Sequence, residues 1–255
     1  LESFSLGRSE GVRFLDASTA HRTDPDWVYG LPELKSQQRE AIAQARWVTN
    51  PGCYPTGFLL ALHPLISCGI VDPGALISIS ALSGYSGGGR TLIEKHEARS
   101  SSNLTEPWHA RPYALTLAHK HVPEMTAYAG LKNAPIFLPT VGNFHQGMLV
   151  SIPIFAAQCL KATSADEIQD ILANRYRDEP CINVAPVNHV DGLDEGFMDP
   201  QAANHTNRVD LFVFGNKQQM VIVARLDNLG KGAAGAAVQN LNLMLQVPEL
   251  TGLTL

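Results

Sequence analysis

Short apolar runs, separated by polar turns, recur along the whole chain and indicate a mixture of strands and helices. Near the N-terminus the pattern predicts a strand at 12–15, a polar loop at 17–25, a helix at 35–45 and a strand at 46–49. A strand, a helix and a further strand in this order are typical of the tail of an α/β unit.

The middle of the chain mixes helical and strand patterns. A helix is predicted from Cys53 to about Cys68, with Gly69 as its stop signal and a kink at Pro64. Residues 75–83 alternate as a strand does, and 84–90 are so rich in glycine that we expect a flexible loop. Residues 97–112 are expected to form a further loop.

The C-terminal half predicts more strands than helices. Strands are expected at 136–140, 148–155, 209–214 and 219–226, the last two as a hairpin around Gly215-Asn216, and Pro139 weakens the first. Ser164 is expected to cap a helix that ends near Tyr176. A final helix is predicted at 231–245, with Val238, Leu241 and Leu245 as its buried stripe. The region 53–226 thus has an α+β pattern.

Composition narrows the class of protein. Of the 255 residues, 45% are hydrophobic and 17% are charged, and the formal net charge is −5 without a basic stripe. Nucleic acid is therefore not an expected partner. No apolar run reaches membrane-spanning length and no signal-peptide pattern opens the chain, so a membrane partner is not expected either. Four scattered cysteines without CxxC spacing favour a reducing, cytoplasmic location.

Cys53 lies in the segment NPGCYPTG at 50–57, between the end of a predicted strand and the start of a predicted helix. Gly52 allows a sharp turn there, and Pro55 suits the first turn of a helix. At a helix N-terminus the free N–H groups and the helix dipole favour a thiolate. We interpret Cys53 as a nucleophile, although a lone cysteine is usually a small buried hydrophobe.

The segment HKHVPE at 119–124 is the second candidate. His119 and His121, two apart on one face of a predicted strand, suit proton transfer near neutral pH. The same spacing also suits a metal ion with Glu124 as a third ligand. A purely structural role is the remaining reading, and the residues alone leave all three open.

Three further segments carry candidate ligand contacts. The glycine-rich loop 84–90 could approach a phosphate or a flat ring, with Arg90 adding charge, although it matches neither a Walker loop nor GxGxxG. Residues 227–240 begin with small residues that a ligand could approach, or that simply pack tightly. Residues 16–22 follow a strand end, where α/β sheets bind ligands, and Arg22 could clamp a phosphate or carboxylate.

Together these five segments resemble the N-acetyl-γ-glutamyl-phosphate reductases, in the shorter of the family's two subclasses. The resemblance covers nearly the whole chain, and it rests on the sequences DASTAHR at 16–22, NPGCYPT at 50–56, SGYSGGGR at 83–90, HKHVPE at 119–124 and KGAAG at 231–235. It implies reduction of N-acetyl-γ-glutamyl phosphate to N-acetylglutamate semialdehyde in arginine biosynthesis. It also implies NADP as cofactor, a cysteine thioester, no metal, and assembly as a homodimer or homotetramer.

The resemblance also implies a domain plan: a partial Rossmann domain at 1–50, a catalytic domain like that of glyceraldehyde-3-phosphate dehydrogenase at 51–226, and a helix at 227–255 that returns to the first domain. The implied catalytic residues are Cys53 and one of the two histidines, with His119 favoured over His121. The implied substrate contacts are Ser18, Arg22, Asn50, Arg90 and Glu124. The implied cofactor contacts are Ser83, Gly84, Ser86, Gly87, Asn228, Lys231 and Gly232.

One feature departs from the family pattern. The family's dinucleotide fingerprint belongs before Asp16 and is missing here, so we expect that an upstream segment is absent and that NADPH binding could suffer. Three alternatives remain: an acyl-phosphate reductase like aspartate-semialdehyde dehydrogenase, a metal-dependent hydrolase that uses the HKHVPE segment, and an inactive fragment that only forms oligomers.

Overall fold

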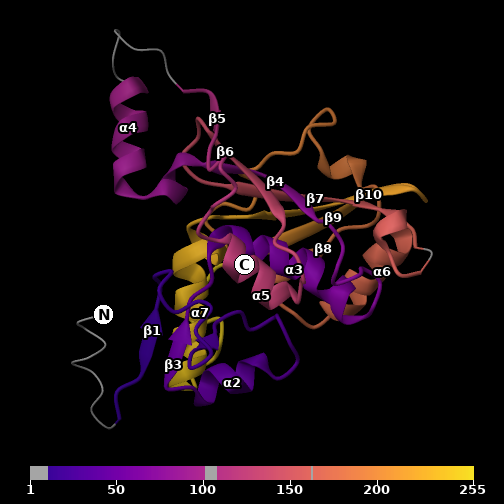
Figure 1. The fold of residues 1–255 in the computed structure, drawn as a ribbon. Helices are drawn as coiled ribbons and strands as arrows, with labels where there is room; N and C mark the ends of the chain where they lie inside the picture. Colours follow the sequence, from indigo (N-terminus) through magenta and orange to yellow (C-terminus); the bar gives the residue numbers. More distant parts are fainter. Residues whose placement is uncertain (1–10, 101–107, 162) are drawn as a thin grey trace.

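The computed structural model describes residues 11–100, 108–161 and 163–255, and within them the chain forms two sheets (Figure 1). The smaller sheet has three parallel strands in the order β1-β3-β2. These strands are β1 (Phe14–Asp16), β2 (Val28–Tyr29) and β3 (Trp47–Thr49). Helices α2 (Gln38–Gln44) and α7 (Gly235–Leu245) pack against each other beside this sheet. The predicted α/β unit at the N-terminal side is confirmed.

The larger sheet has seven strands in the order β5-β6-β4-β7-β10-β9-β8. Its strands are β4 (Ser78–Gly84), β5 (Ala110–Pro112), β6 (Ile136–Gly142), β7 (Met148–Phe155), β8 (Ile182–Val184), β9 (Val209–Gly215) and β10 (Gln219–Leu226). Only the pairs β4–β6 and β8–β9 are parallel. The remaining helices are α3 (Cys53–Ser67), α4 (Arg90–Ser100), α5 (Val122–Ala129) and α6 (Ala165–Arg175).

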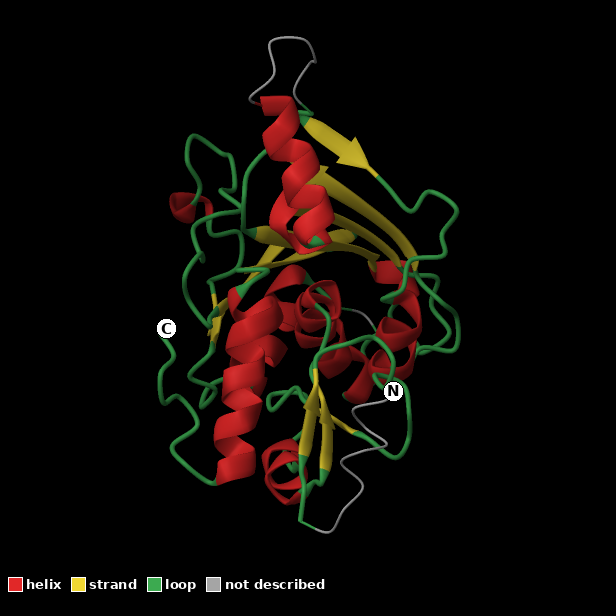
Figure 2. Ribbon diagram, turned by 90° about the vertical axis from the view of Figure 1, so that its left-hand side faces the viewer, coloured by secondary structure: helices red, strands yellow, loops and turns green. Residues whose placement is uncertain are grey.

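Helices α3, α5 and α6 cover one face of the large sheet, and the main hydrophobic core lies between them and the strands (Figures 1 and 2). Helix α3 lies closest, because its Gly57 presents no side chain to the sheet. A Cβ at Gly57 would lie 3.2 Å from side-chain atoms of Val150, Ala224 and Leu226. This close packing fixes the height of α3, and therefore of its first residue, Cys53, over the sheet.

Pro139 does not end β6, which continues to Gly142 between β4 and β5. The carbonyl of Pro139 accepts a hydrogen bond from the N–H of Tyr113, so the nitrogen of Pro139 also faces the short β5 side. The missing N–H is therefore not needed by the ladder to β4. The predicted strand 148–155, the helix capped by Ser164 and the hairpin of β9 and β10 are confirmed.

The glycine-rich segment is not the flexible loop that its composition predicts. It forms a 3-10 turn, Tyr85–Gly88, and then the start of α4. Backbone N–H groups of Gly84, Tyr85 and Ser86 donate to carbonyls in residues 144–147, which holds the turn in place. Of the predicted loop 97–112, residues 97–100 belong to α4 and 110–112 to β5, while 101–107 lie outside the described residues.

The predicted buried stripe of the last helix is wrong. Val238, Leu241 and Leu245 are 36%, 44% and 63% exposed. The buried face of α7 instead carries polar side chains, among them Gln239 and Asn240. Apolar periodicity misled the prediction because the segments facing α7 offer carboxylates and carbonyls, which these amides bind.

A fully buried ion pair ties the C-terminal segment to the N-terminal part. Lys231 lies in a π-helical turn, Gly230–Ala234, and its Nζ is 2.6 Å from Oε1 of Glu33. The Nε2 of Gln239 donates to the same Oε1, and its Oε1 accepts from Lys231. Burial raises the pKa of Glu33, but the charge of Lys231 and these hydrogen bonds outweigh it and leave the pKa below its usual value. Glu33 is therefore a carboxylate.

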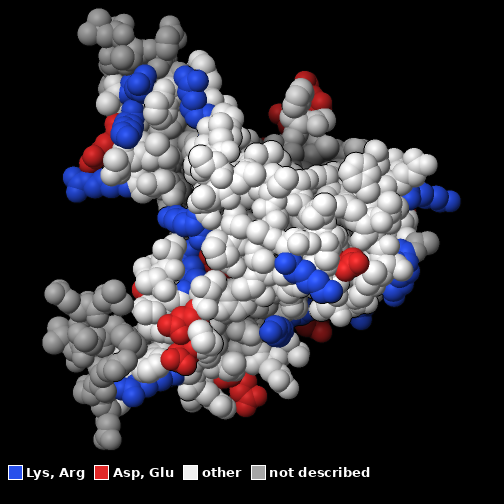
Figure 3. All heavy atoms as spheres, viewed as in Figure 1, with Lys and Arg blue, Asp and Glu red and all other residues white. Residues whose placement is uncertain are grey.

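The surface shows where the molecule is hollowed. In Figure 3 a recess separates the projecting arm that carries α4 from the part that carries β1, and basic side chains lie on that arm as well as over the rest of this face. Among the described residues, no helix is both long and apolar enough to cross a membrane.

We expect Lys231→Met to lower the free energy of unfolding by about 3–5 kcal/mol, because it leaves the Glu33 carboxylate buried without a counter-charge. Chemical denaturation measures this loss, and Lys217→Met at the exposed β9–β10 turn serves as the control. A Lys231→Met protein within about 1 kcal/mol of wild type would contradict the assigned role of the pair.

Candidate active site

Cys53 is the first residue of α3 and follows a tight turn, 50–52, that leaves the small sheet after β3. Gly52 is the N-cap and has no room for a side chain. A Cβ there would lie 2.6 Å from both Nη1 of Arg22 and Nε2 of His121. The glycine thus lets a guanidinium and an imidazole close against the backbone next to the thiol. The predicted position of Cys53 at a helix N-terminus is confirmed.

The carboxylate of Glu124 organises this turn. Its Oε1 accepts hydrogen bonds from the N–H of Gly52 (2.8 Å) and the hydroxyl of Tyr29 (2.7 Å), and its Oε2 pairs with Arg22 (3.2 Å). Arg22 also donates from Nε to the carbonyl of Asn50 (3.0 Å). One buried carboxylate therefore joins α5, the turn before Cys53, strand β2 and the loop between β1 and β2.

Cys53 faces a cavity of about 430 Å³, here called the cysteine cavity. Many of the residues that line it have small side chains. They include Ser86, Gly87, Gly232, Ala233 and Ala237, and Asn228 lies among them. Gly232, in the π-helical turn, touches the nucleophile, since a Cβ on it would lie 2.8 Å from Cβ of Cys53. Arg22, Asn50, Lys120 and His121 also line the cavity, and Asn50 donates from Nδ2 to the carbonyl of Ala233 (3.0 Å). A flat ring and an anionic group could both enter this cavity.

The resting state of Cys53 differs from the expected thiolate. Burial raises the pKa of Cys53 to about 11, although the backbone N–H groups of Cys53 and Tyr54 and the charge of Arg22 act to lower it. The carboxylate of Glu124 raises it further. Desolvation outweighs the helix terminus here, so the free protein holds a thiol at neutral pH. Thiolate formation then needs a proton acceptor close by.

The two histidines do not share a strand face, as the sequence suggested. His119 lies in a turn, and His121 is the N-cap of α5. His121 lies on the wall of the cysteine cavity, whereas His119 lies behind it, with its ring 4.8 Å from that of His121. The Nδ1 of His119 accepts the backbone N–H of His121.

Burial lowers the pKa of both histidines, but not equally. The pKa of His119 falls to about 4, and that of His121 falls to about 2, where the ring also faces His119, Arg22 and Lys120. Both rings are neutral near pH 7 and can accept a proton. A proton on His121 would lie against the guanidinium of Arg22, so His119 is the easier of the two to protonate.

The structure gathers only part of the predicted contacts around Cys53. Arg22, Asn50, Ser86, Gly87, Asn228 and Gly232 line the cysteine cavity. The side chain of Asn228 is already bound on both sides, because its Oδ1 accepts the N–H of Gly147 and its Nδ2 donates to Oγ of Ser86. Glu124 lies behind the wall as a positioning group rather than on it.

Five predicted contacts lie elsewhere, and three of them are Arg90, Ser18 and Lys231. Arg90 pairs with Glu94 and its side chain is 92% exposed, because the segment turns into helix α4 and carries it outward. The hydroxyl of Ser18 donates to Asp16 in an exposed turn. Lys231 is not a cavity residue, since its ammonium is taken up by Glu33.

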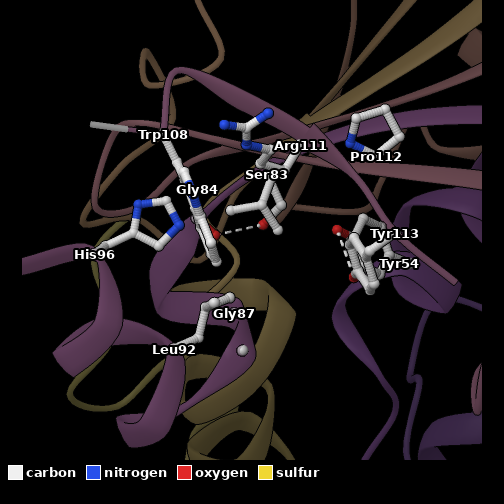
Figure 4. A pocket seen from close by; sticks show the side chains of 12 residues that line it. Tyr54, Ser83, Gly84, Gly87, Leu92, His96, Trp108, Arg111, Pro112 and Tyr113 are labelled. Carbon is white, nitrogen blue, oxygen red and sulfur yellow. Dashed lines mark hydrogen bonds between the residues drawn. The ribbon is translucent and has the colours of Figure 1, made fainter. Parts of the chain in front are cut away.

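Ser83 and Gly84 line a neighbouring cavity of about 360 Å³ between α4, β5 and the sheet, here called the aromatic cavity (Figure 4). Its aromatic residues are Tyr54, His96, Trp108 and Tyr113. Sequence reasoning missed this cavity because 97–112 carried no periodic pattern. The tyrosine directly after Cys53 was the one available signal.

The described residues contain no group of three or more His, Cys, Asp or Glu side chains placed to hold a metal ion. Glu124, the third ligand in the metal reading of HKHVPE, is instead bound by Arg22, Tyr29 and Gly52. Its oxygens are therefore already in use for holding the turn before Cys53.

Solved structures share this fold. Aspartate semialdehyde dehydrogenase II from Vibrio cholerae matches over 91% of this chain and 72% of its own, with a TM-score of 0.69 and 16% identity. Aspartate semialdehyde dehydrogenase from Francisella tularensis matches over 91% and 74%, with a TM-score of 0.70 and 14% identity. The family model "Semialdehyde dehydrogenase, dimerisation domain" matches residues 53–228. The chain therefore belongs to the semialdehyde dehydrogenase class, which implies a nicotinamide dinucleotide cofactor and an oligomer.

Two relatives narrow the assignment. N-acetyl-gamma-glutamyl-phosphate reductase 2 of Nostoc sp. is 49% identical over 99% of this chain, which spans 80% of that relative. N-acetyl-gamma-glutamyl-phosphate reductase of Burkholderia lata is 44% identical over 98% of this chain and 78% of its own length. The chain belongs to the N-acetyl-γ-glutamyl-phosphate reductase family, as the resemblance of its motifs predicts.

The raised pKa of Cys53 predicts how the thiol reacts. Only the thiolate is alkylated, so with a pKa of about 11 the rate constant for iodoacetamide at Cys53 should rise about tenfold per pH unit from pH 7 to 9 and beyond. Peptide mapping separates Cys53 from the other three cysteines, and free glutathione is the reference. A rate at Cys53 that levels off below pH 8 would show a thiolate already present in the resting protein.

Proposed function

We propose that the chain reduces N-acetyl-γ-glutamyl phosphate to N-acetylglutamate semialdehyde and releases phosphate, with NADPH as reductant. The observation that carries this proposal is Cys53 at the start of α3, facing a cavity beside His119 and His121, in a chain 49% identical to a reductase of that name. The order of the five motifs and the length of the match support the same activity.

The sulfur of Cys53 attacks the carbonyl carbon of the acyl phosphate. The C–S bond forms, the C–O bond to phosphate breaks, and phosphate leaves with the electron pair of that bond. The carbonyl oxygen carries negative charge in the transition state. The backbone N–H groups of Cys53 and Tyr54 at the helix start, which already face the sulfur, are proposed to stabilise it, whereas the N–H of Gly52 is taken by Glu124. The acyl group is then held on the enzyme as a thioester.

His119 is proposed as the acid and base. His119 does not line the cysteine cavity, so in this proposal the thiol proton of Cys53 reaches its neutral ring through His121, 4.8 Å away, or through a bridging water. The same path later returns the proton to the thiohemiacetal oxyanion, which then collapses to the aldehyde and the Cys53 thiolate. The pKa of His119, lowered to about 4, is still above that of His121, so His119 is the more readily protonated ring, and the negative charge of a bound acyl phosphate acts against this lowering. His121, held between Arg22 and Gly52, shapes the wall on which the substrate lies.

The residues present fit a nicotinamide ring beside Cys53. The wall of glycine and alanine residues leaves a flat recess next to the sulfur, and Gly232 could not be larger without moving Cys53. Ser86, Gly87, Asn228 and Gly232 are the residues proposed to hold the ring. When bound, NADPH supplies the hydride that reduces the acyl group. The phosphate of the substrate is proposed to meet Arg22, near Asn50.

The oligomer is proposed to form through the face of the large sheet that the helices leave open. Ile136 and Leu138 of β6 project from that face and are about half exposed, whereas Phe137 between them is buried in the core. A homodimer, or a homotetramer of two such dimers, would cover them. A reducing compartment such as the cytoplasm is part of the proposal, since the reaction needs Cys53 as a free thiol.

Cys53→Ser should abolish turnover, with kcat reduced by at least about 10³-fold, because a serine hydroxyl here lacks the acidity and nucleophilicity of a thiol. The assay follows NADP reduction with N-acetylglutamate semialdehyde and phosphate, and thermal unfolding of the variant shows that the fold is kept. Wild-type turnover by Cys53→Ser would refute the mechanism. Preference for aspartate semialdehyde over N-acetylglutamate semialdehyde would move the chain to the alternative acyl-phosphate reductase activity.

The proton-transfer role separates the two histidines. His119→Asn should lower kcat by about 10²–10³-fold with little change in KM. His121→Asn should mainly raise KM, because it alters the cavity wall beside Arg22. The paired steady-state measurements decide between them, and a larger kcat loss in His121→Asn would transfer the acid and base role to that residue.

A further inference from the structure

The aromatic cavity adjoins the cysteine cavity, and Gly87 lines both. Because Gly87 is a glycine, it places no side chain between the two cavities. A Cβ on Gly87 would lie 3.2 Å from Oγ of Ser83 and 3.4 Å from Nδ2 of Asn228. The two cavities therefore meet at Gly87, between Ser83 and Asn228.

One end of the aromatic cavity lies next to the nucleophile. Tyr54 directly follows Cys53, and the hydroxyl of Tyr113 donates to that of Tyr54 at 3.2 Å (Figure 4). The charge of a thiolate at Cys53 contributes to the raised pKa of Tyr113, which burial lifts to about 12. An acyl chain held on the sulfur would thus pass these two rings first.

The far end of the aromatic cavity holds a buried polar atom without a partner. His96 is almost fully buried, is stacked on Tyr85 at 4.7 Å, and has the indole of Trp108 edge-on at 5.4 Å. Its Nε2 has no hydrogen-bond partner among the described residues. Buried nitrogens are normally bonded, so this atom, on a residue that lines the cavity, points to a ligand group such as an amide.

Arg111 brings a positive charge to the lining of the aromatic cavity. It lines the same cavity from β5, and its guanidinium lies 5.8 Å from the Trp108 ring. No carboxylate among the described residues forms an ion pair with it, so its planar donor face is available for a carboxylate of a ligand. Figure 4 shows Arg111 between the histidine end and the tyrosine end of the cavity.

We propose that the aromatic cavity is the specificity site for the N-acylated, carboxylate-bearing end of the substrate. The amide meets Nε2 of His96, the acyl methyl group packs on Trp108, and the α-carboxylate pairs with Arg111. The proposal rests on the proposed function, because it places the reacting carbonyl at Cys53. It also explains selectivity, because a substrate without the N-acyl group leaves the nitrogen of His96 unpaired and makes no contact with the indole of Trp108, over which Arg99 already lies at 4.6 Å.

The test is a binding measurement that does not need turnover. Isothermal titration calorimetry with N-acetylglutamate, an unreactive analogue, and with glutamate as the comparison uses the chain itself. Wild type should bind N-acetylglutamate at least tenfold more tightly than glutamate. Arg111→Met should weaken N-acetylglutamate binding about tenfold, and Trp108→Ala should remove the preference for the acetylated ligand, while Trp108→Phe largely keeps it. Arg177→Met, in the exposed turn after α6, is the matched arginine control.

The outcomes separate this inference from the proposed activity. Wild type that binds N-acetylglutamate selectively but shows no reductase turnover would overturn the activity and leave the specificity site intact. Unchanged binding in both Arg111→Met and Trp108→Ala, or no binding by wild type, would overturn the specificity site. In an active enzyme, Arg111→Met should raise KM for N-acetylglutamate semialdehyde about tenfold with kcat kept within about twofold. Thermal unfolding confirms that each variant is folded.

Discussion

The carboxylate of Glu124 is the constraint on which the site depends. Burial raises the pKa of Glu124, and Arg22, Tyr29 and the N–H of Gly52 stabilise its ionised form, so removal of Arg22 would leave a buried charge without a counter-charge. Because those partners come from different segments, the carboxylate fixes α5 against the turn that presents Cys53. The histidines at the start of α5 are placed by the same contact. Positioning, rather than substrate binding, is its role.

A second buried ion pair holds the π-helical turn that lies against Cys53. Lys231 and Glu33 are both fully buried, and their pairing anchors the π-helical turn whose Gly232 lies against Cys53. The sulfur is thus confined between a turn fixed by one carboxylate and a turn fixed by another. Both are ion pairs in the interior, where breaking a pair costs far more than its presence contributes. Such rigidity suits a nucleophile that must meet its substrate at a set angle.

The strands and helices with strong local signals could be read from the sequence: the capped helix at Ser164, the hairpin at Gly215 and the start of α3 at Cys53. The failures have physical causes. Glycine composition at 84–90 concealed a turn held by carbonyls from 144–147, and the apolar residues of α7 face outward because its inner face binds a carboxylate. Motif spacing identified the residues around Cys53, but it could not show that Lys231 is taken up by Glu33, or that a separate segment supplies Trp108.

The central claim is that the sulfur of Cys53 carries the acyl group during the reaction. The direct measurement is mass spectrometry of the folded, reduced chain after incubation with N-acetyl-γ-glutamyl phosphate in the absence of any nicotinamide, followed by peptide mapping. We expect an N-acetylglutamyl thioester on the peptide that contains Cys53, with one phosphate released per acylated chain. An unmodified Cys53 in a protein that releases phosphate, or acylation confined to another residue, would contradict the claim.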